Sequence, residues 1–200
     1  MGLVPADFPI PPPGLKRPGN RFLRALGRTY FRLAGWRVEG QFPVEPQCVL
    51  IVAPHTSNWD FMLGVAFLLA VDLRVSWLGK HTIFKRPFVN FLKGIGGIPV
   101  NRGASQGMVG QCVRAFREQP SLLLALAPEG TRKGPSRWKS GFYQIAIGAG
   151  VPIFPVGFDF GDHVLRMMPV FQPTGDLTAD MTTLQDLFTP IQGCKPRPSA

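Results

Sequence analysis

His55 and Asp60 are the two residues whose types and spacing point most directly to chemistry. A carboxylate beside an imidazole fixes one ring tautomer, favours the imidazolium and leaves the second ring nitrogen to take a proton from a hydroxyl. The pair can therefore serve as a base without a nucleophilic serine. The alternative is that Asp60 only supports a helix and that His55 is an ordinary turn residue, and the spacing of two residues does not decide between these interpretations.

The pair lies in a polar turn between two apolar segments. Residues 48–53 form an unbroken apolar run of strand length, and residues 61–71 form an apolar run long enough for a helix. Five residues along an α-helix rotate a side chain by about 500°, so the two side chains cannot share a face if both are helical. We therefore expect the histidine before the helix and the aspartate in its first turn, with Ser57 or Asn58 as the N-cap.

A second polar turn follows another apolar run, residues 121–127. Gly130 allows close backbone approach, Thr131 offers a hydroxyl and an amide donor, and Arg132 offers a planar cation, a combination suited to a phosphate or an oxyanion. We expect Glu129 to bond a substrate hydroxyl or to hold the arginines in place. A surface turn stabilised by a Glu–Arg pair is the alternative.

Arg102 ends a third segment of interest. Residues 96–102 leave a glycine turn and run as a short strand, and the planar guanidinium that follows can fork onto a phosphate. The longer stretch 80–102 contains Lys and Arg but no acid, interleaved with Ile, Phe and Leu. That mixture suits an anionic amphiphile, although a core-facing helix with a solvated charged rim explains the phenylalanines equally well.

Apolar strands separated by helical segments predict an α/β fold with a mainly parallel or mixed central sheet flanked by helices. The expected strands are 37–42, 48–53, 73–78, a short one within 96–102, 121–127 and 151–158. The expected helices are 20–35, 61–71, 106–119 and 140–149. Two prolines, at 152 and 155, argue for an edge or irregular position of the last strand.

The length of 200 residues fits one domain with short appendages. The proline-rich residues 1–19 are expected to form a flexible arm, residues 20–190 the domain, and residues 191–200 a flexible tail. The start of the chain lacks the features of a secretory signal, and the longest apolar run falls well short of the roughly 20 residues that cross a bilayer. We therefore expect no transmembrane helix and a location on the cytoplasmic side.

Residues 20–35 predict a basic amphipathic helix, because basic and apolar residues recur there at three- and four-residue spacing on different faces. The basic face would hold Arg21, Arg24, Arg28 and Arg32, and the apolar face Phe22, Leu26, Tyr30 and Leu33. Such a helix can lie in an anionic membrane surface, or it can pack on the domain with its arginines in water. The formal net charge of +10 points in either case to an anionic partner.

Composition argues against several other classes. The three cysteines are odd in number and widely spaced, which favours neither a disulfide framework nor a metal site and fits a reducing compartment. The basic residues accompany no recognisable nucleic-acid module, so we expect no nucleic-acid partner.

Four blocks together resemble the glycerophospholipid acyltransferase superfamily, whose best-known members are the 1-acylglycerol-3-phosphate (lysophosphatidic acid) acyltransferases. The blocks are the His-x4-Asp at 55–60, Gly-Ile-Pro-Val-Asn-Arg at 97–102, Pro-Glu-Gly-Thr-Arg at 128–132 and the proline-bearing strand at 151–156. They occur in the family's order, and the resemblance extends over roughly residues 49–158.

The resemblance implies a glycerol-3-phosphate acyltransferase-like fold and a direct transfer mechanism. His55 would be the general base on an acceptor hydroxyl that attacks an acyl thioester, and Asp60 would orient and charge it. The residues implied to bind the acceptor are Arg102, Glu129, Gly130, Thr131 and Arg132. No metal and no bound cofactor are implied, and the acyl donor would be acyl-coenzyme A or acyl-carrier protein.

These expectations combine into a peripheral membrane acyltransferase that acylates a lysophospholipid, with conversion of lysophosphatidic acid to phosphatidic acid as the leading reaction. Another lysolipid, such as a lyso-amino-acid lipid, is an alternative acceptor. A non-catalytic lipid-binding protein is the alternative from another class.

Overall fold

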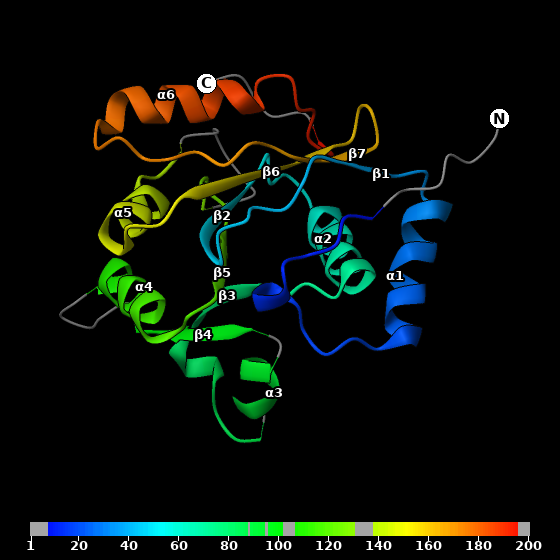
Figure 1. Ribbon diagram of the computed structural model, residues 1–200, viewed down its shortest axis with the longest axis horizontal. Coiled ribbons are helices and arrows are strands. Elements are labelled where there is room, and N and C mark those ends of the chain that lie inside the picture. Colours follow the sequence, from blue (N-terminus) through cyan, green and yellow to red (C-terminus); the bar gives the residue numbers. More distant parts are fainter. Residues whose placement is uncertain (1–7, 88, 95, 102–106, 131–137, 196–200) are drawn as a thin grey trace.

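The computed structural model describes residues 8–87, 89–94, 96–101, 107–130 and 138–195. One sheet runs through this part of the molecule (Figure 1). Its strands are β1 (Arg37–Glu39), β2 (Gln47–Ala53), β3 (Ser76–Lys80), β4 (Gly97–Val100), β5 (Leu122–Leu126), β6 (Ile153–Asp159) and β7 (Val164–Met167). The α-helices are α1 (Arg21–Leu33), α2 (Asn58–Val71), α3 (Val89–Gly94), α4 (Gly107–Glu118), α5 (Gly141–Ala149) and α6 (Leu177–Phe188), and short 3-10 turns cover Pro13–Leu15 and His81–Ile83.

β2 lies at the centre of the sheet, whose strand order is β1-β7-β6-β2-β5-β3-β4. Neighbouring strands are parallel except β6 and β7, which are antiparallel. The expected α/β fold with a mainly parallel central sheet is confirmed. Most of β2 is buried because helices cover both faces of the sheet, which is why its sequence is a continuous apolar run.

β6 is a central strand, which corrects the edge or irregular position that Pro155 within it and Pro152 just before it suggested. It pairs with β2 on one side and β7 on the other, and all its residues are buried. The Pro155 carbonyl faces the end of β7, where it accepts the Met168 N–H at 3.0 Å just beyond that strand. The N–H that proline lacks would point to the same side, where strand pairing has already ended, so the proline is tolerated in this central strand.

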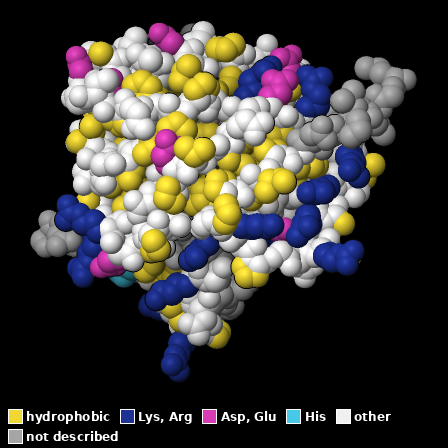
Figure 2. Space-filling view, viewed as in Figure 1, with side chains coloured by type: hydrophobic (Ala, Val, Ile, Leu, Met, Phe, Trp, Pro, Cys, Tyr) yellow, Lys and Arg dark blue, Asp and Glu magenta, His cyan; other side chains and the backbone are white. Residues whose placement is uncertain are grey.

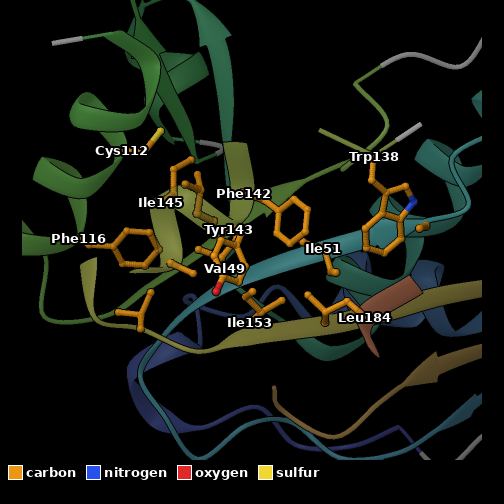
Figure 3. Packing of buried hydrophobic residues seen from close by; sticks show 14 of the residues in the cluster. Val49, Ile51, Cys112, Phe116, Trp138, Phe142, Tyr143, Ile145, Ile153 and Leu184 are labelled. Atoms are coloured by element: carbon orange, nitrogen blue, oxygen red, sulfur yellow. The ribbon is translucent and has the colours of Figure 1, made fainter. Parts of the chain in front are cut away.

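Helices cover the two faces of the sheet in separate groups (Figure 1). α4, α5 and α6 pack on one side and α1 and α2 on the other. Figure 3 shows the first of the two apolar clusters, where Val49 and Ile51 of β2 lie among Tyr143 and Ile145 of α5 and Leu184 of α6. None of the described helices is long and apolar enough to cross a bilayer.

Two arginines of α1 fix the helix on the domain instead of forming part of a solvent-facing basic stripe. α1 crosses α2 at Gly27, where a Cβ would lie 2.5 Å from a backbone oxygen of α2. Arg24 pairs with the buried Asp72 at 2.6 Å, and the Arg28 Nε donates to the Ala70 carbonyl at 3.0 Å. Both contacts place a cation at the C-terminal end of α2, where the helix dipole favours positive charge.

The side of α1 that faces away from the domain is partly apolar. Phe22, Leu26 and Leu33 are 75%, 53% and 82% exposed, and their spacing places them on one face of the helix. Phe31, in contrast, is fully buried against α2. The exposed apolar residues therefore share one face, as expected, whereas two of the arginines expected on the basic face contact α2.

The two end segments expected to be flexible are held on the domain where the structure describes them. Leu15 is buried, and its carbonyl accepts the Arg74 N–H at 2.7 Å. At the other end, Ile191 is only 7% exposed and belongs to the first apolar cluster. Residues 1–7 and 196–200 lie outside the described part of the chain.

A buried polar network joins α6 to α5. The Tyr143 hydroxyl donates to Asp180 Oδ2 at 2.8 Å, and the Thr174 backbone N–H and hydroxyl donate to the same carboxylate at 2.7 and 2.8 Å. Burial raises the pKa of Asp180, but the hydrogen bonds from Thr174 and Tyr143 together lower it by more. The pKa therefore lies below its ordinary value.

We expect Asp180→Asn to reduce stability at neutral pH by about 1–3 kcal/mol, because the network loses its charged acceptor. A lowered folded-state pKa contributes stability above the ordinary carboxyl pKa of about 4, and this contribution is lost as the pH falls below that value. Thermal unfolding of the wild type between about pH 5 and pH 3 should therefore show a larger acid destabilisation than the variant shows. Parallel curves for the two proteins would contradict this account.

Candidate active site

The ends of β2 and β5 meet at a point where the chain changes direction. The two strands are parallel neighbours, with Ile51 of β2 opposite Leu126 of β5. From β2 the chain passes through α2 on one face of the sheet, and from β5 it passes through α5 on the other. In open α/β sheets this topological switch point is where substrates bind, outside the carboxyl ends of the strands. The polar turns that follow β2 and β5 both lie at this edge.

His55 and Asp60 are in contact, as their spacing suggested. The His55 Nδ1 lies 3.2 Å from Asp60 Oδ2. The imidazole is 25% exposed, whereas the carboxylate side chain is 1% exposed. A proton on Nδ1 shared with the carboxylate leaves the lone pair on Nε2, which is the tautomer that a base requires.

The first turn of α2 explains why this contact forms. Ser57 is the N-cap in extended conformation, and its hydroxyl accepts the Trp59 N–H at 3.2 Å. Asp60 Oδ2 accepts the backbone N–H groups of Thr56 and Ser57 at 2.7 and 2.8 Å. The aspartate therefore closes a capping box and holds the turn that carries the imidazole, at the positive end of the helix dipole. Among the described residues, Asp60 Oδ1 has no hydrogen-bond partner.

Glu129 supports the histidine from the neighbouring strand. Its side chain is buried, and its Oε2 accepts the His55 backbone N–H at 2.9 Å. This contact fixes the turn after β2 to the turn after β5. The sequence had suggested a bond to a substrate hydroxyl or to the arginines, and it did not reveal this link to the histidine backbone.

Gly130 has φ +65°, a left-handed conformation that favours glycine. Arg102, Thr131 and Arg132, which the sequence placed at the acceptor, lie outside the described residues. The residue before Arg102 is nevertheless fixed, because the Gln111 side chain bonds both the backbone N–H and the carbonyl of Asn101, at 2.9 and 2.8 Å.

The segment after α6 lies against the turn that carries His55, a contact that the sequence did not reveal. A Cβ at Gly193 would lie 2.8 Å from the Thr56 side chain and 3.2 Å from that of Pro54. The Lys195 N–H donates to Thr56 Oγ1 at 3.2 Å. Residues 191–195, expected to begin a flexible tail, therefore support the turn that carries His55.

An aromatic hollow of about 270 Å³ adjoins the first turn of α2. Its lining residues are Tyr30, Trp36, Trp59, Leu63, Phe160, His163 and Cys194. A larger hollow of about 470 Å³ lies around Gln47 and Pro120, at the opposite edge of the sheet. The smaller hollow lies on the same side as the turn that holds His55, because Trp59 and Cys194 both adjoin that turn. Among the described residues, no group of three His, Cys, Asp or Glu is placed to hold a metal ion.

Residues 36–159, which include the His-x4-Asp turn at the switch point of the sheet, match the Acyltransferase family model. The chain belongs to this acyltransferase family. All four blocks that carried the resemblance fall within the matched residues, so the predicted family is confirmed.

Similar proteins of known name agree with this assignment. The chain is 31% identical to the 1-acyl-sn-glycerol-3-phosphate acyltransferase of Haemophilus influenzae, over 70% of this chain and 62% of that protein. It is 28% identical to the enzyme of the same name from Escherichia coli, over 68% of this chain and 59% of that protein. The match therefore spans about three fifths of the length of these relatives.

A solved structure supports the fold. The 1-acyl-sn-glycerophosphate (LPA) acyltransferase PlsC from Thermotoga maritima superimposes with a TM-score of 0.56 at 16% sequence identity. The superposition covers 86% of this chain and 80% of that one.

Proposed function

We propose that this protein transfers a fatty acyl group from a thioester to the hydroxyl of a lysophospholipid, with lysophosphatidic acid as the leading acceptor. The observation that carries the proposal is an imidazole held by a buried carboxylate at the switch point of the sheet. The names of the two relatives, both 1-acyl-sn-glycerol-3-phosphate acyltransferases, support the choice of acceptor.

In the proposed reaction His55 Nε2 takes the proton of the acceptor hydroxyl as its oxygen attacks the thioester carbonyl. A C–O bond forms, the tetrahedral oxyanion collapses, and the C–S bond breaks. The imidazolium then returns its proton to the departing thiolate, so that the products are an ester and a free thiol. Asp60 stabilises the imidazolium between the two proton transfers.

We propose that the acceptor phosphate meets the cations of two segments, the one that ends at Arg102 and the turn at 128–132. Arg102 and Arg132 would supply guanidinium groups, and Gly130 and Thr131 backbone and hydroxyl donors. Glu129 would contribute by holding His55. The donor is proposed to be acyl-coenzyme A or acyl-carrier protein, with no bound cofactor or metal.

An anionic membrane surface is the proposed source of the acceptor. On the face shown in Figure 2, Lys and Arg gather mainly over the lower half, toward α1 and α3, and most Asp and Glu lie toward the opposite end. The exposed Phe22, Leu26 and Leu33 of α1 add apolar contacts. Tyr30 of α1 and Trp59 of α2 line one hollow, so this side of the molecule adjoins the catalytic turn. We propose that the protein binds the cytoplasmic face of the membrane peripherally through this side.

Replacing Phe22 and Leu33 together by serine should weaken binding to anionic vesicles by about tenfold or more. Each side chain that inserts into the interface is worth on the order of 1 kcal/mol when only part of it is buried. The measurement is vesicle co-sedimentation at low and high salt. Ile147→Ser is the matched control, because Ile147 is also exposed but lies on α5, across the sheet. Equal losses in the two variants would contradict the proposed surface.

The acceptor is tested by mass spectrometry of lipids formed from a mixture of lyso-acceptors, with both thioester donors supplied separately. Phosphatidic acid should be the main product. Turnover restricted to acceptors without phosphate would shift the assignment to lysolipids such as lyso-amino-acid lipids. Vesicle binding with no thioester consumption on any acceptor would indicate a non-catalytic lipid-binding protein.

A further inference from the structure

Lys139 is held beside the turn that follows β5. Its backbone N–H donates to the Pro128 carbonyl at 2.8 Å. The preceding residue, Trp138, is buried and packs edge-on against Phe142 and Phe188, with ring centroids 5.8 and 5.4 Å away. The backbone that carries the lysine is therefore anchored on one side by the core and on the other by the turn.

The side chain of Lys139 extends over Gly130. A Cβ placed on that glycine would lie 3.2 Å from Lys139 Nζ and 3.3 Å from its Cδ and Cε. The lysine is exposed as a residue, so its stem rests on the bare glycine while the ammonium keeps access to solvent. Any larger residue at position 130 would crowd this cation in addition to straining the left-handed backbone.

This position brings a cation to the catalytic edge of the sheet. Gly130 directly follows Glu129, whose carboxylate holds the His55 N–H. Glu129 is also the nearest acid along the chain, but it is buried beneath the turn and its Oε2 is engaged with the histidine backbone. An exposed ammonium on an anchored backbone, beside the turn that holds the His55 backbone, is suited to bind a phosphate as a point charge.

We propose that Lys139 binds a substrate phosphate at this edge of the sheet and so positions the substrate for His55. This inference rests on the proposed function, because it names a further binding residue of the same site. The phosphate has two possible sources, the headgroup of the acceptor and the phosphates of the donor carrier. The two sources share the same chemistry, and the experiment separates them.

The test compares Lys139→Gln with the wild type in four substrate combinations. The acceptors are lysophosphatidic acid and monoacylglycerol, which lacks the phosphate, and the donors are acyl-coenzyme A and an acyl thioester of N-acetylcysteamine, which also lacks phosphate. If the acceptor is the source, the KM for lysophosphatidic acid should rise about ten- to a hundredfold, with little change for monoacylglycerol. If the donor is the source, the increase should follow acyl-coenzyme A instead.

Three controls keep the result interpretable. Lys139→Arg should recover most of the affinity, because it restores the cation. Lys16→Gln removes an exposed lysine at the opposite edge of the sheet and should leave all four combinations unchanged. Thermal unfolding should be the same for the Lys139 variants and the wild type. Equal losses in all four combinations, or no loss in any, would overturn the inference.

Binding without turnover separates this inference from the proposed function. Calorimetric titration of the wild type with glycerol 3-phosphate and with adenosine 3′,5′-bisphosphate, each against its phosphate-free counterpart, measures phosphate binding even if no thioester is consumed. Binding that Lys139→Gln weakens about tenfold or more supports the lysine's role. Binding that is unaffected by the substitution, or that cannot be detected with either probe, would overturn it.

Discussion

Replacing His55 with alanine should lower kcat for acyl transfer by about 10²–10⁴-fold, because the acceptor hydroxyl loses the group that takes its proton. The KM for the acceptor should change little, since the imidazole contributes mainly to the transition state. The side chain is 25% exposed and contacts Asp60 at the surface of the turn, so the fold should survive the change. Steady-state kinetics and thermal unfolding together measure these two effects.

His81→Ala is the matched control for this variant. His81 is an exposed histidine that directly follows β3, another strand of the parallel part of the sheet, and it should tolerate substitution without loss of rate. Full activity of His55→Ala would exclude His55 as the base. A comparable loss in His81→Ala would show that the assay responds to something other than the base.

Asp60→Asn should lower kcat by about 10²–10³-fold while the protein remains folded. Within the described part of the chain, Asp60 accepts hydrogen bonds through Oδ2, so a carboxamide oxygen in the same place can still accept the Thr56 and Ser57 N–H groups. The amide is neutral, however, and cannot stabilise an imidazolium at His55. Its NH₂ group would occupy the buried position of Oδ1, where the described residues offer no partner, at a cost of about 1–3 kcal/mol.

Asp72→Asn provides the matched control, because Asp72 is the buried carboxylate at the other end of α2. It is 2% exposed, pairs with Arg24 at 2.6 Å and likewise has an Oδ1 without a hydrogen-bond partner among the described residues. The two variants should lose stability to a similar extent, but only Asp60→Asn should lose its rate. Equal rate losses would mean that Asp60 acts through the stability of α2 and not through the charge of His55.

Local sequence signals predicted the local geometry well. The apolar run 48–53, followed by Ser57 and an aspartate in the first helical turn, predicted a strand, an N-cap and a helix within a few residues. The structure contains all three, as β2, the Ser57 cap and α2. The contact between His55 and Asp60 is also local, because one capped turn fixes both side chains, and the sequence predicted it.

The sequence did not predict contacts between segments that are far apart along the chain. Pro152 and Pro155 suggested an edge or irregular strand, because a proline ordinarily disrupts pairing. Only the point where β7 ends shows why Pro155 is tolerated in the centre of the sheet. The arginines of α1 suggested a free basic face, but Arg24 and Arg28 find partners at the end of α2. The periodicity of a helix shows which residues share a face, but not what that face meets.

The contacts that support the turn carrying His55 also join segments that are far apart in the sequence. Glu129 is 74 residues from the backbone N–H that it accepts, and Lys195 is 139 residues from the Thr56 hydroxyl to which it donates. The Pro-Glu-Gly-Thr-Arg block marked Glu129 as functional, but its partner depends on β5 lying beside β2. No comparable signal marked residues 191–195.

The most direct test of the proposed mechanism is the stoichiometry of thiol release and ester formation with two matched acceptors. One is lysophosphatidic acid, and the other is its analogue in which hydrogen replaces the free hydroxyl. With lysophosphatidic acid, each free thiol should be matched by one molecule of phosphatidic acid, and with the deoxy analogue neither product should appear. Thiol release without ester, or release that does not depend on the acceptor hydroxyl, would contradict transfer by general-base attack at His55.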